Sequence, residues 1–317
     1  MLQEAGRIVE GRYRLVELLG EGGMGRVWRA TDTRRDIDVA VKLLRAGAPS
    51  RDAVRALFAQ EAELSQRMLS RHIVRVLDRG IDPDGIPFIV FELLDGEDLG
   101  KRLDRLVSLP LVECAEVVVQ VCRALERAHA IGAVHCDIKP ENIFHCPDEG
   151  LYKVLDFGIA RLVTSAAPQG GTPTLSGTIE HMPPEHVVDG KECDARGDLY
   201  ALGVVAYRAM TSRLPFPASN IGQLVLAFSR GAPPPPSTVR PEIPRAFDSW
   251  IERALRRNPE DRFQTAREMA DAFTRTYGRP SPRVSMTMEA VTLGKGFGSS
   301  GVYSAISPSS RDRKRGD

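Results

Sequence analysis

A glycine-rich segment at residues 20–25, GEGGMG, lies between two runs with the alternating apolar pattern of β-strands, at residues 13–19 and 26–30. Because a strand and not a helix follows the glycines, the dinucleotide-binding fold, in which such glycines open a helix, is disfavoured. A glycine-rich hairpin lets backbone N–H groups approach phosphates without a Cβ atom in the way. Alone, the segment fits a phosphate-binding loop and a ligand-free tight turn equally well.

The chain after this hairpin changes from a strand-rich to a helix-rich pattern. Short apolar runs and one helical stripe predict strands over residues 37–43, 73–77 and 88–91, and a helix over residues 51–69. Farther along, apolar residues recur at helical intervals and predict helices over residues 111–130, 198–210, 221–228, 246–256 and 265–277. We therefore predict an α+β protein with a small β-rich lobe and a larger α-helical lobe.

The predicted domain organisation follows from these patterns and from local composition. One folded domain spans residues 13–278, with the β-rich N-lobe at about 13–94 and the helical C-lobe at about 95–278. Residues 1–12 are predicted to be an N-terminal extension. Residues 279–317 are rich in Ser, Gly and Arg and have little to bury, so we predict a disordered tail there.

Composition excludes several classes of protein. With 43 Lys and Arg against 42 Asp and Glu, the formal charge is +1, so we expect no nucleic-acid partner. No stretch approaches the ~18 continuous apolar residues that a membrane-spanning helix needs. Five cysteines without a CxxC pair fit a reduced, cytoplasmic protein better than a disulfide framework or a zinc site. Membrane attachment is expected only if the natural chain continues beyond residue 317.

A lysine and a glutamate in the first lobe have complementary requirements. Glu61 lies on the apolar stripe of the predicted 51–69 helix, and a carboxylate facing a core is costly unless a cation meets it. Lys42, which has apolar neighbours at the end of a predicted strand, supplies that cation. An ion pair between them would hold the ammonium group where it meets the phosphates of a nucleotide. The alternative is a solvated lysine at a strand end.

Two polar motifs in the second lobe carry the oxygen groups of a candidate active site. The first is HCDIKPEN at residues 135–142, which contains Asp137 and Asn142, and the second is LDFG at residues 155–158, which contains Asp156. Carboxylate and amide oxygens are ligands that Mg²⁺ prefers beside phosphates and water. Each motif alone could be an ordinary polar loop, but that alternative is poor for all of them in this order and spacing.

Taken together, the motifs resemble those of the bacterial Hanks-type (eukaryotic-like) serine/threonine protein kinases over about residues 10–277. The shared set comprises the glycine-rich loop, VAVK, the helix glutamate, HxDxKPxN, DFG, and GT followed by PPE. The resemblance implies the bilobal protein-kinase-like fold, with ATP between the lobes. It also implies transfer of the ATP γ-phosphate to Ser and Thr hydroxyls of proteins in bacterial signalling, including hydroxyls of the kinase itself. The implied cofactors are ATP and Mg²⁺, for which Mn²⁺ could substitute.

The same resemblance implies a role for each matching residue. Asp137 accepts or orients the hydroxyl proton of the acceptor, and Lys139 steadies the γ-phosphate. Asn142 and Asp156 hold magnesium. The residues implied in nucleotide binding are Leu19, Gly20, Gly22, Gly25, Val27, Ala40, Lys42, Glu61, Glu92, Leu94, Asp98 and Phe144. Phe91 takes the position between the lobes that controls access behind the nucleotide.

Two structural roles and the expected partners also follow from the resemblance. Glu185 is expected to pair with Arg262 and brace the large lobe. Asp198 is expected to accept hydrogen bonds from the backbone of the 135–142 loop. Protein substrates are the expected partners, together with a transient homodimer for autophosphorylation.

This chain departs from the family pattern at three positions. Cys136 stands where most members have arginine before the catalytic aspartate, which makes this a non-RD variant. His181 and Pro183 replace the usual tyrosine and alanine of the segment before Pro184-Glu185. Cys136 invites a redox switch, but we expect a small, partly buried apolar side chain instead.

The candidate sites of autophosphorylation are Thr172 and Thr174, because they lie in the most exposed-looking part of the segment between DFG and PPE. Two other functions were weighed: a pseudokinase that only binds, and a small-molecule kinase of the aminoglycoside-phosphotransferase type. All the phosphate- and metal-binding residues of the pattern are present, which argues against the first. Lys139 and the PPE motif argue for a protein substrate over the second.

Overall fold

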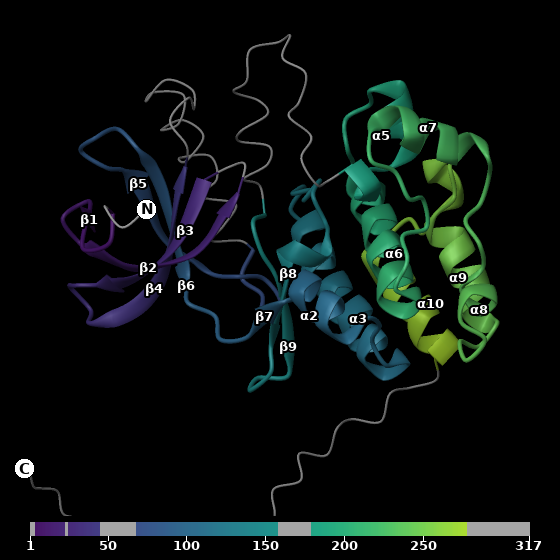
Figure 1. Cartoon of the computed structure of the whole chain (residues 1–317), viewed down its shortest axis with the longest axis horizontal. Coiled ribbons are helices and arrows are strands. Elements are labelled where there is room, and N and C mark those ends of the chain that lie inside the picture. The colour runs from purple at the N-terminus through teal and green to yellow at the C-terminus, as the bar shows by residue number, and fades with distance from the viewer. Residues whose placement is uncertain (1–3, 23–24, 45–67, 158–178, 278–317) are drawn as a thin grey trace, which may run out of the picture. The chain divides into compact units, whose positions relative to one another are not determined.

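The computed structural model describes residues 4–22, 25–44, 68–157 and 179–277, and Figure 1 shows how their helices and strands are arranged. A six-stranded sheet contains β1 (Ile8–Val9), β2 (Tyr13–Gly22), β3 (Gly25–Asp32), β4 (Ile37–Leu44), β5 (Val76–Ile81) and β6 (Pro87–Glu92). The strand order is β1-β2-β3-β4-β6-β5, and all neighbouring pairs are antiparallel. The glycine-rich segment connects β2 to β3, so the predicted hairpin is confirmed.

Strand β4 is buried on both of its faces, because two apolar clusters lie on opposite sides of the sheet. Val39, Val41 and Leu43 belong to one cluster, and Ala40 and Leu44 belong to the other. Successive side chains of a strand point to opposite faces. Lys42 therefore shares a face with Ala40 and Leu44, and it is buried there.

Two element predictions in this lobe were wrong at their ends. The strand predicted over residues 73–77 begins at Val76 instead, because Val74 N–H bonds to Val154 O at 3.0 Å and Ile73 forms an isolated bridge with Val154. The backbone there is held by the other lobe before it joins the sheet. Of the helix predicted over residues 51–69, only Met68 and Leu69 are among the described residues, and these two are not helical.

The second lobe begins with a three-stranded antiparallel sheet in the order β7-β8-β9. Its strands are β7 (Glu97–Asp98), β8 (Ile143–Cys146) and β9 (Leu151–Val154). The helices are α2 (Leu99–Leu106), α3 (Leu111–His129), α5 (Pro184–Asp189), α6 (Ala195–Thr211), α7 (Ile221–Ser229), α8 (Pro236–Val239), α9 (Ala246–Ala254) and α10 (Ala266–Tyr277). Short 3₁₀ turns are found at Pro140–Asn142, Ile179–His181 and Pro259–Asp261. Helices α3, α6, α9 and α10 contribute to the largest hydrophobic core (Figure 1).

Helix α6 begins three residues earlier than predicted. Asp194 caps it by accepting a hydrogen bond from Arg196 N at 2.8 Å, as capping aspartates do. Asp198 consequently lies in the first turn of the helix and is almost fully buried. A buried carboxylate requires hydrogen-bond donors, and the 135–142 loop provides them.

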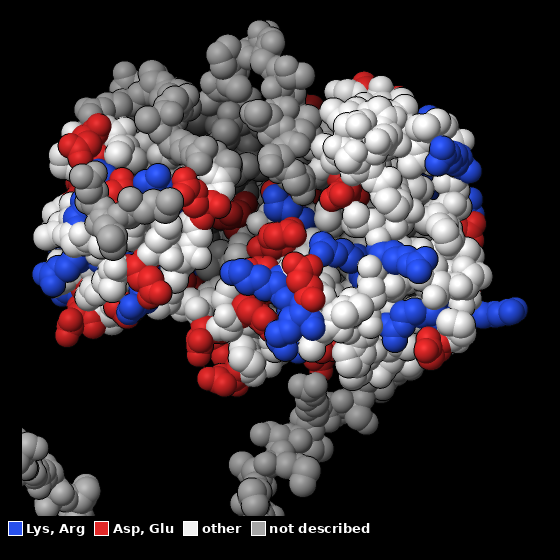
Figure 2. Space-filling model, viewed as in Figure 1, with Lys and Arg blue, Asp and Glu red and all other residues white. Residues whose placement is uncertain are grey.

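The molecular surface carries both signs of charge. On the face shown in Figure 2, basic and acidic side chains of the described residues lie interspersed. Some of them form ion pairs, such as Arg102 with Glu97 and Arg208 with Asp104, each at 3.0 Å. No helix among the described residues is long and apolar enough to cross a membrane. That the chain has no nucleic-acid partner stays a prediction.

Candidate active site

The 135–142 loop is fixed to helix α6 by a single carboxylate. Asp198 accepts hydrogen bonds from His135 N at 2.9 Å and from Cys136 N at 2.7 Å. The ring of His129 donates a third at 2.8 Å. These contacts hold Cys136 at a φ of 63°, a left-handed conformation that non-glycine residues adopt only when the surroundings enforce it. The expected contact of Asp198 with the loop backbone is confirmed.

The two carboxylate oxygens of Asp137 have different environments. Oδ2 accepts hydrogen bonds from Lys139 Nζ at 2.8 Å and from Asn142 Nδ2 at 3.1 Å. Oδ1 is buried and has no hydrogen-bond partner among the described residues. An unpaired buried oxygen is costly, and such atoms are expected where a ligand completes the site. Asp137 therefore has one oxygen held by the protein and one free to accept a proton or a hydrogen bond.

Lys42 reaches across from the N-lobe sheet to the LDFG motif. Its Nζ lies 2.6 Å from Asp156 Oδ2, and Asp156 has a left-handed φ of 58°. This contact brings together two predicted site residues that are far apart in the sequence. Glu61, the expected partner of Lys42, lies outside the described residues, so that ion pair stays a prediction.

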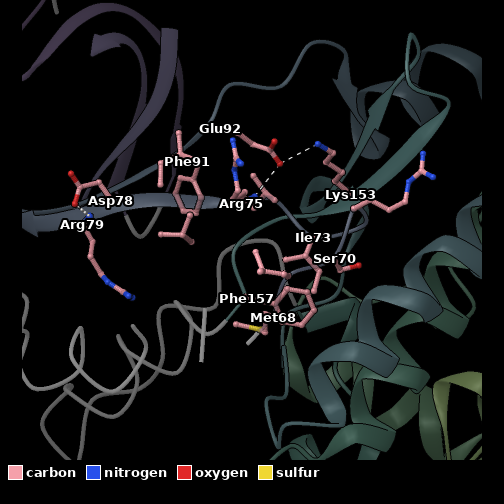
Figure 3. A pocket seen from close by; sticks show the side chains of 15 residues that line it. Met68, Ser70, Ile73, Arg75, Asp78, Arg79, Phe91, Glu92, Lys153 and Phe157 are labelled. Carbon is pink, nitrogen blue, oxygen red and sulfur yellow. Dashed lines mark hydrogen bonds and ion pairs between the residues drawn. The ribbon is translucent and has the colours of Figure 1, made fainter. Parts of the chain in front are cut away.

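Phe157, the residue after Asp156, packs into the C-lobe. Its ring contacts the His135 ring edge-on, with ring centroids 4.7 Å apart. Figure 3 shows the Phe157 side chain beside Met68 and Ile73. Because His135 donates from Nε2 to Leu155 O at 2.7 Å, the same histidine links both polar motifs. His135 therefore has a structural position.

The predicted adenine-contacting side chains gather on one face of the N-lobe sheet. Ala40 belongs to the apolar cluster of that face, and Val27 and Leu94 pack against it. Phe91 is paired with Ala40 in the sheet and is buried in the same cluster. Glu92 N–H is bonded to Arg75 O at 3.0 Å, so this N–H is already used within the protein.

Asp98 and Phe144 are brought together by the small sheet, where they are directly paired across β7 and β8. Asp98 also caps helix α2 by accepting from Lys101 N at 2.9 Å. Leu19 is exposed, and a Cβ atom on Gly20 or Gly22 would meet nothing within 4 Å. These three residues have open space in front of them, as a nucleotide site requires. The candidate acceptors Thr172 and Thr174 lie outside the described residues.

The donor set suits a magnesium-bound nucleotide. Asn142 uses its amide nitrogen to donate to Asp137 O at 2.7 Å, so its amide oxygen remains available as a ligand. Asp156 supplies a carboxylate beside the ammonium group of Lys42. Hard oxygen donors of this kind match Mg²⁺, which usually binds one or two protein oxygens together with phosphate and water.

A separate cavity lies beside the 68–79 segment. It has a volume of about 800 Å³ and is lined by residues from the 68–79 segment together with Phe91, Glu92, Lys153 and Phe157 (Figure 3). In that cavity wall Glu92 bonds to Lys153 Nζ at 3.1 Å. Lys42, Asp137 and Asp156 are not in its lining, so this cavity is not the site of the predicted chemistry.

The structure adds two residues that the sequence reasoning did not place. His181 is buried beside Asp137 and Cys136, and neither of its ring nitrogens has a hydrogen-bond partner among the described residues. Burial lowers the pKa of His181 to about 3. Cys193 lines a small cavity that is also lined by His181, Cys136 and Asp137. Nothing in the sequence indicates that Cys193 lies near Asp137. The expectation that Cys136 is partly buried was wrong, because it is exposed.

The ion pair predicted between Glu185 and Arg262 is present. Arg262 Nη1 lies 2.7 Å from Glu185 Oε1, and Nη2 lies 2.5 Å from Oε2. Arg262 also donates to Arg256 O and Arg257 O and lies over the ring of Tyr200, at 4.7 Å from its centroid. This bidentate pair joins α5 to the segment before α10 in the interior of the C-lobe.

Comparison with known proteins decides the family. The model of the protein kinase domain matches residues 13–274. The chain belongs to the protein kinase family. The fold is therefore the bilobal kinase fold, with a β-sheet N-lobe and a helical C-lobe, and the predicted fold class is confirmed.

Relatives of this kinase domain are bacterial serine/threonine-protein kinases. Pkn1 of Myxococcus xanthus is 40% identical over 268 residues, which are 83% of this chain and 38% of that protein. PknH of Mycobacterium bovis is 38% identical over 261 residues, which are 82% of this chain and 43% of that protein. The kinase domain of Mycobacterium tuberculosis PknI has a TM-score of 0.67 and 29% identity, and the match covers 86% of this chain and 98% of that one. The chain thus spans about two fifths of the length of the curated relatives it matches.

Proposed function

We propose that this kinase domain transfers the γ-phosphate of ATP to Ser and Thr hydroxyls of proteins, including its own. The observation that carries the proposal is the position of Asp137, with Oδ2 held by Lys139 and Asn142 and Oδ1 unpartnered. A carboxylate oriented in this way can accept or orient the proton of a substrate hydroxyl. The family membership and the serine/threonine-kinase relatives support the same reaction.

The other site residues have roles in positioning and charge stabilisation. Lys42 contacts the phosphates of ATP, and Lys139 offsets negative charge on the group being transferred. Asp156 and Asn142 would hold magnesium, which would offset negative charge on the phosphates of a bound nucleotide. Mn²⁺ can take the same oxygens. Because phosphoryl transfer needs little covalent help from the protein, alignment of these groups accounts for most of the rate enhancement.

The adenine and ribose are held by the β-rich lobe and the segment after it. Val27, Ala40 and Leu94 line the apolar face that accepts the ring, and Phe144 closes it from the other lobe. The Glu92 carbonyl and the Leu94 backbone bond to adenine, and Asp98 lies near the ribose. Gly20, Gly22 and Gly25 allow the backbone to approach the phosphates.

We infer that regulation differs from that of relatives with an arginine before the catalytic aspartate. This chain is a non-RD kinase, because Cys136 stands where most members have arginine. A cysteine side chain has no positive charge that could bind the phosphate of a modified loop residue. Thr172 and Thr174 are the proposed acceptors in a transient homodimer. Mass spectrometry after incubation with Mg-ATP should find phosphate on them, whereas a Thr172→Ala/Thr174→Ala protein should keep much of its activity on an added substrate. Near-complete loss, with folding intact, would contradict reduced dependence on loop phosphorylation.

The reaction itself is tested with labelled ATP. The unmodified protein should label itself and a generic protein substrate on Ser and Thr, and Lys42→Met and Asp137→Asn proteins should lose this by about 100-fold or more. Lys191→Met is the matched control, because the Lys191 side chain is exposed and pairs with exposed Asp189, which has no proposed role in the site. Full labelling by Asp137→Asn would exclude the proposed mechanism. Protein substrates are a proposal supported by the serine/threonine-protein kinase relatives, and a cytoplasmic location is a proposal supported by the five free cysteines.

A further inference from the structure

Two cysteines meet directly behind the proposed catalytic aspartate. Cys136 precedes Asp137, and Cys193 lies on the connection between α5 and α6. The Cys193 thiol donates a hydrogen bond to Asp194 O at 3.6 Å, and the neighbouring Cys136 side chain contributes to raising its pKa. Both are free thiols, and both line the small cavity that also contains Asp137. Two thiols that line the same small cavity need only a small movement of their loops to become covalently linked.

Helix α6 fixes both cysteines from the same turn. A Cβ atom on Gly197 would lie 2.5 Å from Cys193 Sγ, so the sulfur rests against the glycine backbone and only glycine leaves room for it. The next residue, Asp198, accepts the Cys136 backbone N–H at 2.7 Å. The two loops are therefore held against adjacent residues of one helix, and their proximity does not depend on a flexible contact.

The space between these side chains is too small for another ligand. The cavity measures about 10 Å³, which is roughly what one water needs. Among the described residues, no group of three His, Cys, Asp or Glu side chains could hold a metal ion, so Cys136, Cys193 and His181 are not a zinc site. Direct reaction between the two sulfurs is the remaining chemistry for this pair.

The five cysteines of the chain differ in access to solvent. Cys136 is exposed and Cys193 is partly exposed, whereas Cys114, Cys122 and Cys146 are buried. Burial raises the pKa of Cys114 to about 12 and that of Cys146 to about 11, so these thiols stay protonated and unreactive. The neighbouring Cys136 side chain and burial also raise the pKa of Cys193, so peroxide is expected to react first with the exposed Cys136, and Cys193 then reacts only with the oxidised sulfur beside it.

We propose that hydrogen peroxide links Cys136 and Cys193 in a disulfide, and that this bond reversibly stops phosphoryl transfer. The Cys136 sulfur attacks one peroxide oxygen, the O–O bond breaks, and the products are a sulfenic acid and water. The Cys193 sulfur then attacks the Cys136 sulfur, the S–O bond breaks, and the hydroxyl leaves with the Cys193 proton as a second water. Two thiols are oxidised by two electrons, and one peroxide is reduced to two waters.

The bond acts on Asp137 through the backbone. A disulfide holds its two sulfurs ~2.05 Å apart, which is shorter than any non-bonded separation. The two loops that carry Cys136 and Cys193 must therefore move toward each other. Cys136 has a constrained backbone conformation, and Asp137 follows it directly. A displacement of about 1 Å at a catalytic group can lower the rate by about 100-fold. This effect on activity rests on the proposed function, whereas formation of the bond does not.

The test starts from fully reduced protein that is treated briefly with hydrogen peroxide, after which free thiols are alkylated and peptides are mapped by mass spectrometry. The expected result is a linked pair of peptides containing Cys136 and Cys193. Phosphotransfer should fall about 10- to 100-fold and should return after treatment with dithiothreitol. Cys136→Ser protein should keep its own starting activity through the same treatment. Cys146→Ala, which alters a buried cysteine, should respond as the unmodified protein does.

Three results would overturn the proposal. One is the absence of the linked peptides when alkylation shows that Cys136 has been oxidised. Another is a disulfide-linked protein that transfers phosphate as fast as the protein with both thiols free. The third is equal inactivation of Cys136→Ser and unmodified protein by peroxide. Reduced protein that is inactive from the start would instead contradict the proposed function, and peptide mapping would still decide whether the bond forms.

Discussion

At the scale of single residues, His181 combines burial with a lack of partners. An unfolded histidine binds a proton near pH 6.5, but burial, Arg208 and Lys139 lower the pKa of His181 to about 3 in the fold. Between these pH values the unfolded chain binds more protons than the native one. The free energy of unfolding must therefore decrease as the pH falls below about 6.5. His72 acts in the same direction, because burial also lowers its pKa.

We expect His181→Phe to remove part of this pH dependence. Between pH 7 and pH 5 the unmodified protein should lose about 2 kcal/mol of stability more than the variant does, from the protonation of the unfolded chain alone. Urea unfolding followed by fluorescence at both pH values measures the difference. The control is His186→Phe, since His186 is exposed on α5. Equal losses in His181→Phe and unmodified protein would contradict a neutral His181 in the folded protein.

Gly25 is a residue whose identity the backbone dictates. Its φ is 151°, and a Cβ atom there would lie 2.1 Å from Leu43 O on the neighbouring strand. Gly22, its partner across the β2–β3 hairpin, has nothing within 4 Å of a Cβ atom. The two glycines therefore have different roles in the hairpin.

Gly25→Ala should destabilise the protein by about 1–3 kcal/mol, because the strand must move or the backbone must adopt a strained conformation. Gly22→Ala should change stability by much less. Urea unfolding without nucleotide separates this effect from any contact with phosphates. A Gly25→Ala protein as stable as Gly22→Ala would show that the β3–β4 pairing is looser than the structure has it.

At the scale of elements, the C-lobe is braced by a buried ion pair. Arg262 is almost fully buried and links α5 to the segment before α10 through Glu185. Removing one member leaves the other charge buried without compensation, which costs more than removing both. This asymmetry gives the pair a measurable signature.

Arg262→Met should lose about 3–5 kcal/mol of stability, and the thermal midpoint should fall by roughly 10 °C. Adding Glu185→Leu should recover part of that loss, because no unpaired carboxylate remains. Arg257→Met serves as the control, since Arg257 is exposed on the same segment. Scanning calorimetry of the unmodified protein, Arg262→Met, Glu185→Leu and the double variant completes the cycle. If the double variant were the least stable, the penalty would come from lost packing over Tyr200 and not from an unpaired charge.

At the scale of the whole molecule, the candidate nucleotide site draws on both lobes. Lys42 comes from the six-stranded sheet, and Asp156 and Asn142 come from the segments around the small sheet. A ligand that binds only when these groups are together stabilises the folded arrangement by mass action.

Mg-ATP at about 100 times its dissociation constant should add about 2.7 kcal/mol of stability, which is roughly 5–10 °C in thermal midpoint. The shift should shrink with ATP alone and in Asp156→Asn protein, because the metal ligand is lost. Asp148→Asn, altered at an exposed turn, should keep the full shift. Differential scanning fluorimetry measures all of them. An undiminished shift in Asp156→Asn would contradict the assignment of Asp156 as a metal ligand.

The sequence by itself determined the features that depend on local pattern. Alternation of apolar residues predicted the strands around the glycine-rich hairpin, and helical spacing predicted α3, α7, α9 and α10 to within two residues at either end. The spacing of HCDIKPEN and LDFG carried the resemblance to the kinase family, which the family match confirmed. The roles of the individual site residues stay predictions.

Only the tertiary structure decided what depends on contacts between distant segments. The strand expected at residue 73 begins at Val76, because Val154 of the other lobe bonds to His72 O and to Val74 N–H on either side of Ile73. The unpaired Oδ1 of Asp137, the partnerless ring of His181 and the meeting of Cys136 with Cys193 also arise there. Hydrogen-bond satisfaction and burial are properties of three-dimensional neighbours, and residue order along the chain does not specify which groups those neighbours are.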